Sequence, residues 1–77
     1  MAIVTGFSPV TKDRVGAAKT TECGVASVEL NGTSYLLVES YGAADRKIPG
    51  KVSQSLHFDR ERAAELKRLL EQHVPGI

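Results

Sequence analysis

The sequence predicts a small α+β domain, in which an antiparallel sheet of about four strands (strand, hairpin, strand) packs one face against a single C-terminal amphipathic helix. Two patterns carry this prediction. An Asn-Gly pair lies between two runs of β-favouring residues, and residues 59–74 repeat their apolar positions with the period of a helix. A chain of 77 residues suffices for one such domain, residues 1–77, and is too short for a barrel or a doubly wound sheet.

The first strand is expected over residues 2–7, which end at the breaker pair Ser8-Pro9. The next segment, residues 11–22, is polar and rich in Gly, Ala and Thr. It also carries three basic side chains, so we expect a solvated loop there.

The strongest local signal is a β-hairpin, formed by residues 24–30 and 33–41 around Asn31-Gly32. Both positions of a type I′ turn need a positive φ, which Asn and Gly tolerate. One face of the hairpin then carries Leu30, Val28, Tyr35, Ala26 and Leu37. The other face carries Cys23, Val25, Leu36 and Val38, together with the polar residues Ser27, Glu29 and Ser34. A sheet with one solvent-exposed face would not place apolar residues on both faces, so we expect both faces to be partly covered.

The last strand is expected over residues 52–58. It follows a basic loop at 42–51, whose Pro49-Gly50 pair suits a type II turn. The strand residues alternate in character, which separates them into two sets. Val52, Gln54, Leu56 and Phe58 are predicted to point inward, and Ser53, Ser55 and His57 outward.

The C-terminal segment has the start and stop signals of a helix. Asp59 is a favourable N-cap, and Glu61 places a carboxylate in the first turn, where the helix dipole favours negative charge. Pro75-Gly76 ends the helix. The apolar stripe between these signals consists of Ala63, Leu66, Leu69, Leu70, His73 and Val74. With the helix on one face of the sheet, the opposite face, with Val25, Leu36 and Val38, is left for a partner.

The composition predicts a thinly stabilised protein. A chain this short has a small core, and its one cysteine, Cys23, forms no intramolecular disulfide, which favours oligomerisation. A lone cysteine, expected to be half-buried in a strand, indicates a reducing compartment. We find neither a signal peptide nor a long apolar run, so we expect a cytoplasmic protein without a membrane contact. The net charge of +1 gives no general attraction to nucleic acid or lipid.

No set of residues indicates catalysis, a metal site or a cofactor. Ser55, His57 and Asp59 resemble a hydrolytic trio, but neighbours on one strand face stand parallel, about 6.6–7 Å apart, instead of converging. His57, His73 and Cys23 lack the spacing of metal ligands. We therefore expect a protein that is not an enzyme.

Part of the chain resembles a known family. The similar elements are the strand at 35–39 with Tyr41 after it, the loop at 47–51, the segment 56–59 and the helix at 63–70. Together they look like the C-terminal half of the positive-cofactor-four type of transcriptional coactivator. The resemblance implies a curved four-stranded sheet with one C-terminal helix. It also implies dimerisation through the helix and nearby strands, and binding of single-stranded DNA on the sheet.

Two functions agree with these features. The first is a small interaction module that binds a protein partner and forms a homodimer. It could be an adaptor or an inhibitor, including a phage or mobile-element inhibitor of the anti-CRISPR type. Its candidate contact residues are Val25, Leu36, Val38 and Tyr41. The alternative is binding of single-stranded nucleic acid, with Tyr35 or Tyr41 stacking on bases. The phosphate-binding residues of this alternative are Lys12, Arg14, Lys19, Arg46, Lys47 and Lys51.

Overall fold

The computed structural model describes residues 1–41 and 52–77, and the structural statements below refer to these two ranges. The predicted loop at 42–51 lies outside them, together with its Pro49-Gly50 turn. The same holds for Arg46, Lys47 and Lys51.

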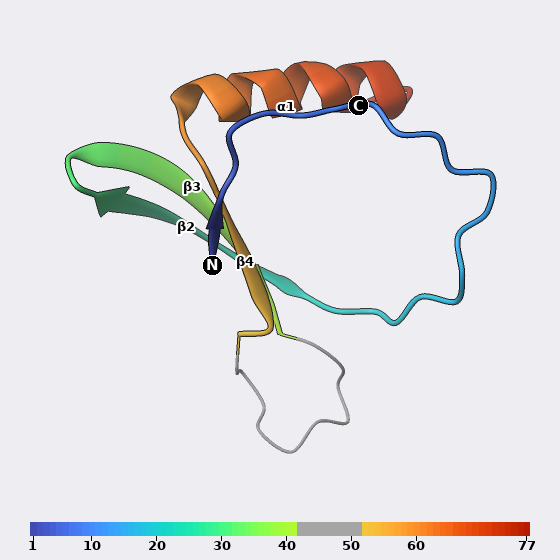
Figure 1. The fold of residues 1–77 in the computed structure, drawn as a ribbon, viewed down its shortest axis with the longest axis horizontal. Coiled ribbons are helices and arrows are strands. Elements are labelled where there is room, and N and C mark those ends of the chain that lie inside the picture. Colours follow the sequence, from blue (N-terminus) through green and yellow to red (C-terminus); the bar gives the residue numbers. More distant parts are fainter. Residues whose placement is uncertain (42–51) are drawn as a thin grey trace.

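The protein is an α+β domain, as predicted. Four strands, β1 (Ala2–Ile3), β2 (Cys23–Leu30), β3 (Thr33–Ser40) and β4 (Gln54–Phe58), form one sheet in the order β1-β4-β3-β2 (Figure 1). The pairs β2–β3 and β3–β4 are antiparallel, whereas β1 pairs with β4 in parallel, so the sheet is mixed. One helix, α1 (Arg60–His73), contacts β3 and β4.

The first strand is shorter than predicted, because the chain turns from the sheet to the helix. After β1, the Val4 N–H still donates to the His57 carbonyl oxygen at 2.9 Å. The chain then runs along α1 (Figure 1). There the Arg62 guanidinium donates to the Thr5 carbonyl oxygen at 2.6 Å, and the Phe7 ring stacks on Phe58 with centroids 6.3 Å apart. Phe7, predicted as a strand residue, thus packs on Phe58 of β4.

The hairpin turn is confirmed. Asn31 has φ 51° and Gly32 has φ 80°, the two positive values that a type I′ turn requires. The turn sets the register of the two long strands, so that Leu30 pairs with Thr33 and Val25 with Val38. Both pairs are those that a two-residue loop predicts.

The helix begins and ends where its capping residues predict. The carboxylate of Asp59 accepts the Arg62 backbone N–H at 2.8 Å, which satisfies one of the free donors of the first turn. The helix ends at His73, before Pro75-Gly76. Of the predicted stripe, Ala63, Leu66 and Leu69 are half-buried, whereas Leu70 and Val74 are each 44% exposed.

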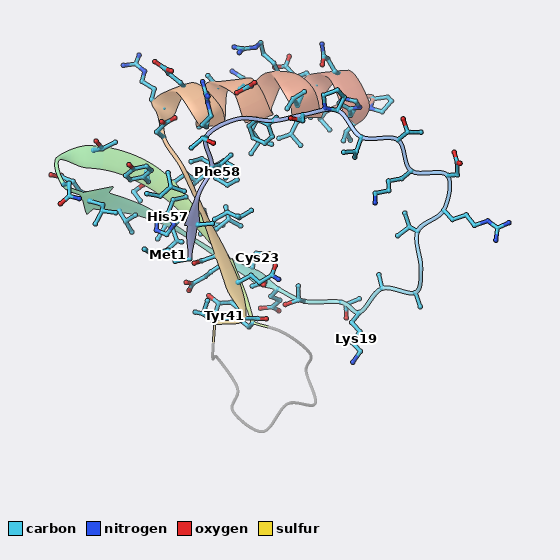
Figure 2. All side chains as sticks on the ribbon, viewed as in Figure 1. Met1, Lys19, Cys23, Tyr41, His57 and Phe58 are labelled. Carbon is cyan, nitrogen blue, oxygen red and sulfur yellow. The ribbon has the colours of Figure 1, made fainter. Side chains whose placement is uncertain are left out.

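Two adjacent residues of β4 form the buried centre of the described ranges. Phe58 and His57 are each 6% exposed. Neighbouring residues of a strand point to opposite faces. Figure 2 accordingly shows Phe58 beneath α1 and His57 on the other side of β4.

The prediction that His57 points to solvent is wrong. The register places it beside Ile3 and Leu37, and the Tyr35 ring packs edge-on against it at 5.9 Å. His57 therefore packs on the face of the sheet that carries Tyr35 and Leu37, and its Nδ1 is buried there without a hydrogen-bond partner among residues 1–41 and 52–77.

Two other expectations are corrected. Leu36 pairs with Phe58, and Val38 with Leu56, so Leu36 and Val38 lie on the face that carries α1 and not on the opposite one. The antiparallel register across β3 and β4 decides this assignment. Cys23 is exposed instead of half-buried, because it begins a strand at the edge of the sheet.

Candidate interaction surface

A line of apolar side chains crosses the whole sheet on the face that carries α1. The register aligns Val25 with Val38, Val38 with Leu56, and Leu56 with Ala2. Residues aligned across neighbouring strands point to the same side. These four side chains, which we call the apolar row, therefore form one line. At about 4.8 Å between strands the row is roughly 14 Å long.

The apolar row is only partly covered. Val25 is 67% exposed and Leu56 is 44% exposed, whereas Val38 between them is half-buried. The neighbouring rows are Ser27, Leu36 and Phe58 toward α1, and Cys23, Ser40 and Gln54 away from it. The row of Cys23, Ser40 and Gln54 is polar. An exposed apolar line with a polar border has the composition of the centre and rim of a protein interface.

The structure brings together three of the four predicted contact residues. Val25 and Val38 belong to the apolar row, and Leu36 lies one row nearer to α1, half-buried. Tyr41 lies on the opposite face, because its hydroxyl sits over Gly24, whose neighbour Val25 points the other way. Sequence reasoning missed Leu56 as a surface residue, because the alternation of β4 assigned it to the interior.

The Tyr41 side chain packs over Gly24. The position of a Cβ on Gly24 is occupied by the Tyr41 hydroxyl, with the ring Cζ at 3.1 Å and the Glu39 Cγ at 3.3 Å. The hydroxyl donates to Glu39 Oε1 at 2.9 Å. This hydrogen bond, with desolvation and the charge of Glu39 adding to it, raises the pKa of Tyr41 above its ordinary 10.0. Close approach of the ring therefore explains the glycine inside a strand.

We expect Gly24→Ala to displace the Tyr41 ring and to break its hydrogen bond with Glu39. The pKa of Tyr41 should then fall toward 10.0. Because the bond favours the neutral phenol, any stability it adds is present below pH 10 and is lost as the pH rises through the raised pKa. Ultraviolet titration of tyrosinate measures the change, with Tyr41→Phe to assign the signal. An unchanged Tyr41 titration in Gly24→Ala would contradict this packing.

No strand of the described residues pairs with the outer side of β2, which is an edge eight residues long. In a two-residue hairpin the Leu30–Thr33 pair is hydrogen-bonded, and such pairs alternate along the ladder. The backbone groups of the even-numbered residues therefore point to β3. Those of Cys23, Val25, Ser27 and Glu29 point outward, and no backbone hydrogen bond from the described ranges reaches them. We call these four residues the β2 edge.

The described residues of the nucleic-acid alternative lie in different environments. Tyr35 is half-buried and packs against His57 with an angle of 81° between the rings. Lys12, Arg14 and Lys19 are exposed on the segment between β1 and β2. Figure 2 shows Lys19 directed away from the sheet.

Nothing in the two described ranges groups three or more His, Cys, Asp or Glu residues as a metal ion would need. No helix within 1–41 or 52–77 has the length and apolar character that crossing a membrane requires. Comparison with protein families, curated proteins and solved structures gives no match for this chain. The resemblance to the coactivator family therefore stays a prediction, and the surface chemistry is what points to function.

Proposed function

We propose that this chain is a non-enzymatic interaction module that binds a protein partner on the apolar row. One observation carries the proposal: Val25 and Leu56 remain 67% and 44% exposed on a line that runs across the sheet. Burial of apolar area contributes about 25 cal/mol per Å², so such a line is a source of binding free energy. An adaptor or an inhibitor role is consistent with this surface.

The ligand that suits this surface is an apolar protein segment. The row is roughly 14 Å long and one side chain wide, which matches three or four residues of an extended strand or two turns of a helix. Its polar border offers a thiol, a hydroxyl and an amide, from Cys23, Ser40 and Gln54, without a formal charge. A strongly charged partner surface would meet no opposite charge on this border and would gain no electrostatic attraction there.

Leu56→Lys is expected to abolish partner binding, because it places a charge in the middle of the apolar row. Leu70→Lys is the matched control, since Leu70 is the same residue type with the same exposed fraction, 44%, on α1. The purified chain, its folding checked by circular dichroism, is immobilised and exposed to lysate of the source cell. Mass spectrometry identifies the retained proteins.

Proteins retained by the wild type and by Leu70→Lys, and lost with Leu56→Lys, support the proposal. Retention that Leu56→Lys leaves unchanged contradicts it, as does the absence of retained protein. Salt-sensitive retention of a labelled single-stranded oligonucleotide, with no protein bound, would replace it with the nucleic-acid alternative.

A further inference from the structure

We infer that the β2 edge pairs with the β2 edge of a second copy, antiparallel and about a two-fold axis at Ala26, so that two sheets join into one of eight strands. The inference deepens the proposed function, on which it rests, because it names a second copy as a partner that binds beside the apolar row. Three observations support it: the outward backbone groups of the edge, the register that the two faces permit, and the apolar side chains of β2 that remain exposed.

The β2 edge lacks the features with which proteins protect open edges. Such edges are usually short, or carry proline, bulges or lysine. β2 has eight residues, is paired without interruption to β3, and contains one charged residue, Glu29. Helix α1 contacts β3 and β4 and leaves β2 uncovered. As far as the described residues are concerned, the outward N–H and C=O groups of β2 are therefore available to another strand.

The faces of the sheet restrict the pairing to two central registers. Residues opposite each other in an antiparallel pair must point to the same face, so odd-numbered residues meet odd-numbered ones. These are also the residues whose backbone groups point outward. The axis must then pass through a residue, and only Ala26 and Ser27 keep seven residues of the strand paired.

Charge and apolar contact select Ala26 over Ser27. With the axis at Ala26, Glu29 lies opposite the second copy's Cys23, and the two glutamates are six positions apart, about 20 Å along the strand. With the axis at Ser27 they are four positions apart, about 13 Å. The Ala26 axis also places Val25 diagonal to its counterpart, within about 7–8 Å. The most exposed residue of each apolar row, Val25, thus becomes a diagonal neighbour of its counterpart in the second copy.

Apolar side chains of β2 remain exposed. Val25, which belongs to the β2 edge, is 67% exposed, and Leu30 at the end of the strand is 38% exposed. Burial of apolar area contributes about 25 cal/mol per Å², so covering Val25 in an edge pairing adds binding free energy to the backbone hydrogen bonds.

A disulfide placed on the axis tests the pairing. In a Cys23→Ser background, Ala26→Cys puts two thiols at a non-hydrogen-bonded pair with Cα atoms about 4.5 Å apart, which a disulfide can span. Ser27→Cys, on the same exposed edge, puts its two thiols on a diagonal with Cα atoms about 8 Å apart, too far for a disulfide. With oxidised glutathione, Ala26→Cys should form covalent dimer at least roughly tenfold faster than Ser27→Cys.

Sedimentation of the uncross-linked chain provides the second measurement. Val25→Lys, which brings two lysines close to the axis, should weaken the dimer by roughly tenfold or more. Val15→Lys, on a valine outside the sheet that is 83% exposed against 67% for Val25, should not weaken it. Equal or faster cross-linking of Ser27→Cys, or a monomer at micromolar concentration, would overturn the inference. Loss of partner capture in Leu56→Lys is measured separately, so the proposed function stands or fails by its own experiment.

Discussion

Phe58→Ala is expected to lower the free energy of unfolding by about 3–5 kcal/mol, the usual effect of truncating a buried phenylalanine. The ring is 6% exposed, stacks on Phe7 and lies beneath α1. Its removal takes away the one apolar side chain that is buried in the described ranges, and loosens the contact of sheet, helix and N-terminal segment together. Urea denaturation followed by circular dichroism measures the loss.

Leu70→Ala serves as the control for Phe58→Ala. Leu70 is 44% exposed on α1, so its truncation should lower the free energy of unfolding by about 1 kcal/mol or less. This is well below the loss expected for a buried leucine. Equal losses for the two variants would mean that Phe58 is not the centre of packing. A stable domain has only about 5–15 kcal/mol in total, so Phe58→Ala should leave a chain of this size close to unfolding.

Gly32→Val is expected to destabilise the protein by about 2 kcal/mol or more, because a β-branched residue rarely adopts positive φ. Gly32 has φ 80°, and an added Cβ meets no atom within 4 Å. The cost is therefore conformational and not steric. Urea denaturation measures it, and amide hydrogen exchange on β2 and β3 shows whether the loss is confined to the hairpin.

Asn31→Gly is the matched control in the same turn. Asn31 has φ 51°, which glycine adopts without strain, so this variant should stay within about 1 kcal/mol of the wild type. A near-neutral Gly32→Val, or an equal loss in both variants, would contradict the type I′ turn as the determinant of the hairpin.

The parts of the fold that the sequence predicts are those with local causes. Asn31-Gly32 needs only its own backbone preferences to make a turn, and Asp59 needs only the amide three residues later to cap α1. The pairing of β1 with β4 joins Ala2 to Leu56, and no local pattern encodes it. The length of β1 was overestimated for the same reason, since Phe7 is held by Phe58 and not by a strand.

The candidate surface also combines features that have local causes with features that depend on long-range strand pairing. Alternation along the hairpin correctly placed Val25, Leu36 and Val38 on one face. Which of the two faces carries α1 depends on how β4 docks beside β3, and this register cannot be read from either strand alone. The burial of His57 and the exposure of Leu56 follow from that register, so sequence alternation assigned both to the wrong environment.

The parallel β1–β4 pair also limits the order in which the strands of the sheet can pair during synthesis on the ribosome. β1 is synthesised first, but its partner, β4, is more than fifty residues away along the chain. The hairpin closes over two residues and is complete long before β4 emerges, and short-range contacts form fastest. β1 therefore stays unpaired until β4 has been synthesised, and its docking on β4 is expected after the hairpin has closed. A fusion at the N-terminus that slows this docking would prolong the lifetime of a half-assembled sheet with both edges open.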